Sequence, residues 1–95
     1  MFDHLAGLSL DTLRVFEAAA RLRGFTAAAL ELGTTQPAVS QQVKRLEAQL
    51  GTRLFDRIYR GIALTEAGQL LFEQVHQGLQ AMDDGLALAS GRGQR

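Results

Sequence analysis

The residues best equipped for chemistry lie in the stretch TTQPAVSQQVKRLEAQL, which starts at Thr34. If this stretch is helical, at about 100° per residue, one face of it is polar. That face carries Pro37, Ser40, Gln41, Lys44 and Arg45. Glutamine amides suit the edge of adenine and lysine ammonium groups suit guanine in a DNA major groove. Taken alone, such residues are more often a solvated surface, so the neighbouring elements decide between the two interpretations.

The other face of the same stretch is aliphatic, which predicts a helix packed on a core. Its apolar residues recur at i, i+4, i+7 and i+11 and are Val39, Val43, Leu46 and Leu50. Thr35 can cap this helix, Pro37 falls in its first turn, where a missing N–H costs nothing, and Gly51 ends it.

Two further helices are predicted before this one. The first is capped by Ser9, carries an apolar row and stops at Gly24. The row consists of Leu10, Leu13, Phe16 and Ala20. The second is short, with Thr26 as its cap, Phe25 and Leu30 as a hydrophobic staple, and Gly33 at its exit. Two helices joined by a short polar turn, the second with a polar outer face, are typical of a helix-turn-helix.

Several side chains around this unit could contact nucleic acid. Thr26, Thr34 and Thr35 could offer hydroxyl or amide contacts to phosphates. The stretch TRLFDRIYRGIALT mixes β-branched and aromatic residues and predicts a small hairpin, or wing. Arg60 at its tip could enter a minor groove or hold a phosphate. For Arg57 the sequence leaves two roles open, pairing with a carboxylate to brace the wing or binding a phosphate.

A long final helix follows, capped by Thr65. Its apolar residues step by three and four, which predicts a seam for a partner helix in a homodimer, although the row could also pack only on its own domain. The row consists of Leu71, Val75, Leu79, Met82, Leu86 and Ala89. Gly78 and Gly85 lie beside it and would permit close approach of a second helix.

The composition of the chain and the distribution of its charges limit which classes of function are possible. The 95 residues contain no cysteine and have a formal net charge of zero, but the charge is unevenly distributed. The segment 35–61 is rich in Lys and Arg, whereas 62–90 has acids and neither Lys nor Arg, so the middle can still attract an anion. His4 and His76 have no partner ligands at metal spacing, so no metal or cofactor is expected. We expect no enzyme, because the sequence has no cysteine, no phosphate-cradling glycine loop and no carboxylate or histidine cluster that could serve as acid, base or metal ligand. No membrane span or leader is expected either, hence a cytoplasmic protein.

The longer string FEAAARLRGFTAAALELGTTQPAVSQQVKRLEAQLGTRLFDRIYRGIALTEAG resembles the N-terminal DNA-binding domain of LysR-type transcriptional regulators. The matching pieces are GFTAAALELG, TQPAVSQQVKRLE, LGTRLFDR and LTEAG, and the likeness extends roughly from Leu8 to Leu88. The opening LRVFEAAAR is similar to the branch of glycine-cleavage and β-lactamase regulators. The resemblance implies a long linker helix that pairs two domains in a dimer. Two-fold pairing would present two recognition helices to DNA, so the operator is expected to be pseudo-palindromic. It also implies a small-molecule effector that binds a separate C-terminal domain, absent here, so that this chain would be a fragment of a longer regulator.

The resemblance also implies roles for single residues. Groove-facing positions of the family match Gln36, Pro37, Ser40, Gln41 and Lys44, and the minor-groove arginine of its wing matches Arg60. Gln41 departs from the Arg of many relatives, and Ala27 stands where a basic residue is frequent. Both departures are expected to lower affinity for DNA rather than to alter the fold.

We therefore predict a mainly α protein, a winged helix-turn-helix with a three-helix core and a small β-hairpin wing, followed by a long linker helix for dimerisation. The expected division is 1–64 for the DNA-binding domain, 65–90 for the linker helix and 91–95 for a disordered tail. An alternative of another class is a helical dimerisation module whose basic face only aids solubility. RNA binding is disfavoured, because Tyr59 is the only tyrosine and tryptophan is lacking.

Overall fold

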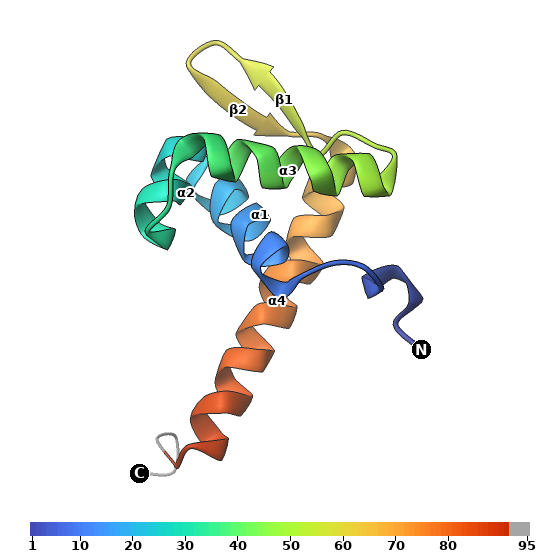
Figure 1. Cartoon of the computed structure of the whole chain (residues 1–95), viewed down its shortest axis with the longest axis vertical. Coiled ribbons are helices and arrows are strands. Elements are labelled where there is room, and N and C mark those ends of the chain that lie inside the picture. The colour runs from blue at the N-terminus through green and yellow to red at the C-terminus, as the bar shows by residue number, and fades with distance from the viewer. Residues whose placement is uncertain (92–95) are drawn as a thin grey trace.

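The computed structural model describes residues 1–91 and contains four α-helices and one hairpin (Figure 1). After a 3-10 turn at Asp3–Leu5, the elements are α1 (Leu10–Leu22), α2 (Phe25–Leu32), α3 (Gln36–Leu50), β1 (Phe55–Ile58), β2 (Gly61–Leu64) and α4 (Glu66–Ala89). This is the mainly α architecture with a two-stranded wing that the sequence predicts. The expectation of a disordered tail falls, from residue 92 onward, outside the described residues.

Three helices begin at the caps that the sequence predicts. The hydroxyls of Ser9, Thr35 and Thr65 each accept a hydrogen bond from the backbone N–H of the residue three positions later, at 3.1, 3.3 and 3.0 Å. Each bond satisfies one of the free N–H groups in a first helical turn. Gly33 and Gly51 end α2 and α3 in the left-handed conformation, which a residue without Cβ adopts without strain.

The expected start of α2 is wrong. The helix begins at Phe25 with Gly24 as N-cap, so Thr26 lies inside the first turn and does not cap it. The reason is the tight turn before it, in which Arg23 adopts a left-handed φ of 56° and the Gly24 N–H donates to the Ala19 carbonyl. The predicted staple also fails, because Leu30 is 79% exposed.

The core forms where α1, α2 and α3 meet the base of the wing. Phe16, Val39, Leu46 and Leu54 are fully buried. The rings of Phe16 and Phe25 each lie 5.6 Å from that of Phe55, the first residue of β1, a spacing typical of favourable aromatic pairs.

Two predicted rows are shorter in the structure than expected. The row on α3 contributes Val39, Val43 and Leu46, but Leu50 is 42% exposed because the last turn of α3 extends past the core. On α1, Phe16 and Ala20 are buried, whereas Leu10 is 52% exposed in the first turn.

The wing is an antiparallel pair in which Phe55 lies opposite Leu64 and Ile58 opposite Gly61. It is joined to α3 by one carboxylate. Glu47 Oε2 accepts the N–H groups of Leu54 and Phe55 at 2.7 and 3.2 Å. The wing therefore starts at a fixed place beside α3.

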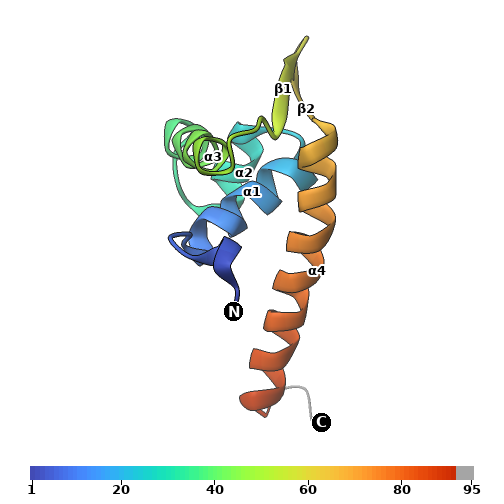
Figure 2. The ribbon, with the colours of Figure 1, turned by 90° about the vertical axis from the view of Figure 1, so that its right-hand side faces the viewer.

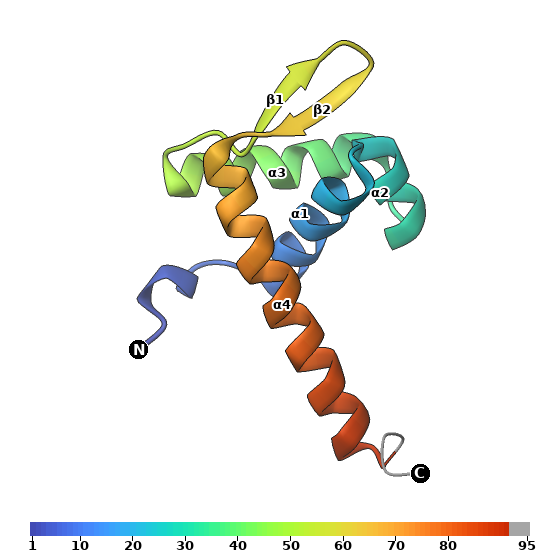
Figure 3. The same cartoon turned by 180° about the vertical axis from the view of Figure 1, so that it is seen from behind.

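Helix α4 begins under the wing, passes α1 and extends away from the rest of the molecule (Figures 1 and 3). Its first turn packs tightly, since a Cβ on Gly68 would lie 2.1 Å from the Leu54 carbonyl oxygen. The molecule measures 46 Å along its longest axis. Along that axis α3 and the wing lie at one end and the free part of α4 at the other (Figure 2).

Candidate nucleic-acid interface

The outer face of α3 is exposed where the sequence predicts groove contacts. Gln36, Pro37, Gln41, Lys44 and Arg45 are exposed, and Ser40 is half-buried. Because Val39, Val43 and Leu46 hold the opposite face in the core, this polar face cannot turn inward. The structure thus presents an amide, a hydroxyl and cations on one rigid helix.

The threonines around the turn are exposed as well. Thr26, Thr34 and Thr35 all lie at the protein surface near the start of α2 or α3. The Thr35 hydroxyl already accepts the Ala38 N–H, so it has a structural role as the cap of α3. Thr26, inside the first turn of α2, leaves its side chain on the surface rather than at the helix end.

The cations of the molecule fall into two groups. Arg14 pairs with Asp11, Arg53 with Asp56, and Arg21 with both Glu17 and Glu31. Within residues 1–91, the cations that have no ion-pair partner are Arg23, Lys44, Arg45, Arg57 and Arg60. All of them lie on α3, on the wing or at the turn before α2, so the unpaired positive charge gathers at one end of the molecule.

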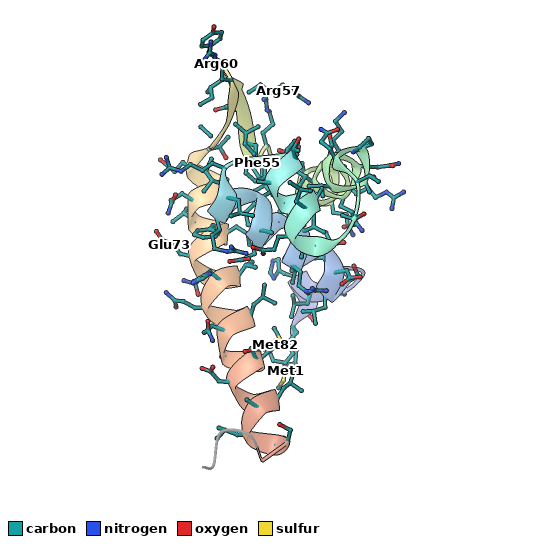
Figure 4. The ribbon with its side chains drawn as sticks, turned by 90° about the vertical axis from the view of Figure 1, so that its left-hand side faces the viewer. Met1, Phe55, Arg57, Arg60, Glu73 and Met82 are labelled. Atoms are coloured by element: carbon teal, nitrogen blue, oxygen red, sulfur yellow. The ribbon has the colours of Figure 1, made fainter. Side chains whose placement is uncertain are left out.

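The tip of the wing carries its most prominent side chains. Arg60 adopts a left-handed φ of 64° in the turn, and its guanidinium carbon lies 5.1 Å from the centre of the Tyr59 ring. Figure 4 shows Arg60 at the far end of the hairpin, away from the helices. A cation projected on such an arm could reach a second groove beside the one that α3 faces.

Two residues of this surface escaped the sequence analysis. Arg23, exposed at the end of α1, lines a hollow with Ile58 and Leu64 on the wing. Glu47 fixes the wing to α3, across a turn whose geometry the sequence does not reveal. The unusual left-handed Arg23 gives no sequence signal either, because the following glycine is the expected place for such a conformation.

The structure divides the predicted seam of α4 into two parts. Leu71 and Val75 pack against the core of the chain's own domain. Leu79 lies at a groove beside α1, while Met82 and Leu86 are 47% and 70% exposed. Only the distal part of the row is left open to a partner.

A polar network joins α4 to α1 and α2 at the point where this division occurs. Glu17 on α1 accepts hydrogen bonds from Arg21 Nε at 2.9 Å and lies 2.8 Å from His76 Nδ1 on α4. Burial raises the pKa of the Glu17 carboxyl, but the hydrogen bonds from Arg21 and His76 outweigh burial and hold that pKa below its ordinary value. His76 therefore has a carboxylate partner on α1.

Neither a metal cluster nor a membrane span is evident in the part of the chain that the structure describes. No group of three or more His, Asp or Glu side chains among residues 1–91 could hold a metal ion. No helix there is long and apolar enough to cross a bilayer.

Solved structures match this arrangement closely. The crystal structure of the BenM_DBD/catB site 1 DNA complex superimposes with a TM-score of 0.82 at 30% identity, covering 87% of this chain and 92% of that chain. The CbnR_DBD-DNA complex gives a TM-score of 0.77 at 31% identity, covering 90% of this chain and 99% of that chain. Both are described as complexes of DNA-binding domains with DNA.

Sequence relatives agree. HTH-type transcriptional activator AmpR of Providencia stuartii is 52% identical over 82% of this chain, and HTH-type transcriptional regulator BudR of Klebsiella aerogenes is 49% identical over 88%. The carbapenem-hydrolyzing beta-lactamase transcriptional activator of Enterobacter cloacae is 48% identical, in keeping with the likeness of LRVFEAAAR to β-lactamase regulators. The chain spans 29% of the AmpR length and 59% of the BudR length. Residues 10–69 match the family described as bacterial regulatory helix-turn-helix protein, lysR family, and the chain belongs to that family.

Proposed function

We propose that this chain binds double-stranded DNA sequence-specifically, as the DNA-binding part of a LysR-type transcriptional regulator. The observation that carries the proposal is the exposed polar face of α3 beside a group of unpaired cations on α3 and the wing. Gln36, Gln41 and Lys44 would contact base edges in the major groove, with Pro37 and Ser40 allowing close approach. Phosphates would be bound by Thr26, Thr34, Thr35 and Arg45. Arg60 would enter the adjacent minor groove.

We infer that the chain acts as a dimer through the distal part of α4. Leu79, Met82 and Leu86 form an apolar row that the domain's own core does not cover, which supports this role. Leu71 and Val75 would contribute less to the partner contact, because they already pack on the domain's own core. Two-fold pairing would present two α3 helices to DNA, so the operator would be pseudo-palindromic.

The effector response is proposed to lie outside these residues. This proposal rests on the family resemblance, in which a domain that follows the linker helix binds the small molecule. For the residues described here, we assign no effector site.

Salt dependence of binding tests the DNA proposal. Neutralising several phosphates with cations releases counterions, so affinity should fall steeply between about 50 and 200 mM salt. Lys44→Ala and Arg60→Ala should each lower affinity for most duplexes. Fluorescence anisotropy with labelled duplexes measures both effects. If Arg60→Ala left affinity for specific and random duplexes unchanged, the role of the wing would be refuted.

A further inference from the structure

The polar network between α1, α2 and α4 has no part in the proposed contacts with DNA. The guanidinium of Arg21 on α1 is its centre, since Nε and Nη2 donate to the two carboxylate oxygens of Glu17 at 2.9 and 3.1 Å. Arg21 Nη1 also donates to Glu31 Oε1 on α2 at 3.1 Å. On α4, His76 Nδ1 lies 2.8 Å from Glu17 Oε2. We refer to these four residues as the α1–α4 network.

His76 is the point at which α4 enters this network. Of the side chains in residues 66–89, all of which the structure describes, only that of His76 is hydrogen-bonded to another element. The Glu17 side chain is 12% exposed, and a carboxylate with so little access to water depends on its protein partners. The Phe72 ring, which packs against the core, lies 5.5 Å from the imidazole. The imidazole is thus held by a carboxylate and an aromatic ring.

The network is the second of two places where α4 is fixed to the domain. The first is Gly68, which packs against the Leu54 carbonyl. At 1.5 Å per residue, His76 lies about 12 Å further along the helix, and two such points define the direction of α4. Figure 2 shows that α4 then leaves the domain. Residues 77–89 extend about 20 Å beyond the network, so a turn of about 10° there would move the helix end by about 3.5 Å, close to the rise of one base pair.

We propose that the contact between Glu17 and His76 fixes the direction of α4 relative to α3, and thereby sets the distance between the two half-sites that a dimer can occupy. The inference rests on the proposed dimeric DNA binding and deepens it. Helix α3 moves with α1, because the two share the core and the Thr12 hydroxyl donates to Gln42 Oε1 at 2.8 Å. The distal part of α4 carries the proposed partner contact. Glu17 and His76 are therefore positioning residues that read no base.

The charge of the network depends on His76. Glu17 and Glu31 are two acids that share one cation, Arg21, so a neutral imidazole leaves one negative charge in excess. Imidazole side chains commonly gain a proton between about pH 5 and pH 8. A hydrogen bond between charged partners is roughly twice as strong as one between neutral partners. The direction of α4 should therefore be held more firmly at pH 6 than at pH 8.

The other charged groups at this site leave it predominantly acidic. Arg14 on α1 lines the neighbouring groove but pairs with Asp11. Asp83 on α4 lines the same groove and adds a further negative charge. Glu73, one turn earlier on α4, accepts a hydrogen bond within its own helix. None of these groups supplies Glu17 with a second cation, so that role is left to His76.

Duplexes that differ only in half-site spacing test the inference. The half-sites come from duplexes that the wild type selects from a random pool, and the spacer is varied one base pair at a time. The wild type should bind its best spacing more tightly than the neighbouring ones by about tenfold at pH 6 and about threefold at pH 8. His76→Ala should remove most of this preference at both pH values and leave affinity for an isolated half-site unchanged. His76→Gln keeps a donor without a titrating charge, so at both pH values it should show the preference of the wild type at pH 8.

A second histidine provides the control for the pH profile. His4→Ala removes the histidine of the exposed 3-10 turn and should leave both the spacing preference and its pH dependence as in the wild type. A His76→Ala protein with the spacing preference of the wild type would overturn the inference. So would a wild type that binds half-sites without discriminating between spacings. A wild type without salt-dependent duplex binding would instead refute the proposed function itself.

Two spin labels measure the direction of α4 without DNA. The chain has no cysteine, so labels attach only where cysteines are introduced. Ala48→Cys near the end of α3 and Asp84→Cys on the distal part of α4 change exposed residues. The distance between the labels within one chain, measured after dilution with unlabelled protein, should be narrowly distributed at pH 6 and should broaden with His76→Ala. Equally narrow distributions in the two proteins would overturn the inference, whatever the result with DNA.

Discussion

At the scale of single residues, α3 separates contacts that select a base from contacts that only position the helix. Gln41 projects an amide from the exposed face, whereas Arg45 on the same helix can bind any phosphate. Gln41→Ala should therefore relax preference at one or two base pairs per half-site, by about 1–3 kcal/mol of discrimination. Competition between operator duplexes with single base changes measures this. An unaltered ranking of those duplexes would remove Gln41 from base recognition.

Glu17 makes stability depend on pH. Its pKa is lowered in the folded state, so its contribution is present above the ordinary value of 4.5 and is lost as pH falls through the lower folded value. Glu17→Gln should lower the free energy of unfolding at neutral pH by about 1–3 kcal/mol and flatten its decline in acid. Denaturant unfolding from pH 7 to pH 3 measures both. Asp11→Asn, at the exposed pair with Arg14, is the control and should change little.

At the scale of elements, the first turn of α4 fixes the linker helix to the wing. Gly68→Ala should destabilise the fold by at least about 1–3 kcal/mol, because its Cβ would collide with the Leu54 carbonyl oxygen at 2.1 Å. Gly78→Ala on the same helix meets nothing within 4 Å and should stabilise the monomer by about 0.5–1 kcal/mol. Thermal unfolding at low protein concentration compares the two. A Gly68→Ala protein as stable as Gly78→Ala would show that α4 does not pack there.

At the scale of the whole molecule, the distal row of α4 is expected to join two chains. Leu86→Asp should shift the chain to monomer and weaken operator binding, since one α3 helix then binds without its partner. Gln77→Asp, on the exposed opposite face of α4, is the matched control and should leave the dimer intact. Sedimentation equilibrium measures the outcome. A Leu86→Asp chain that dimerised as well as Gln77→Asp would exclude this row from the interface.

Features that depend on one element could be predicted from the sequence, whereas features that depend on packing between elements could not. Caps such as Thr35 and Thr65, and the outward face of α3, follow from spacing within one element, and the structure confirms them. The predicted start of α2 was wrong because Arg23, rather than the glycine after it, takes the left-handed conformation at the turn. The division of the α4 row and the link from Glu47 to the wing depend on packing between elements, which periodicity along one helix does not encode.

The central claim is that α3 and the wing recognise a specific DNA sequence as a dimer. Selection of bound duplexes from a random pool, at two salt concentrations, tests it most directly. The account predicts a pseudo-palindromic motif whose affinity falls steeply as salt rises. Recovery of no motif, together with salt-insensitive self-association, would contradict it and leave a dimerisation module.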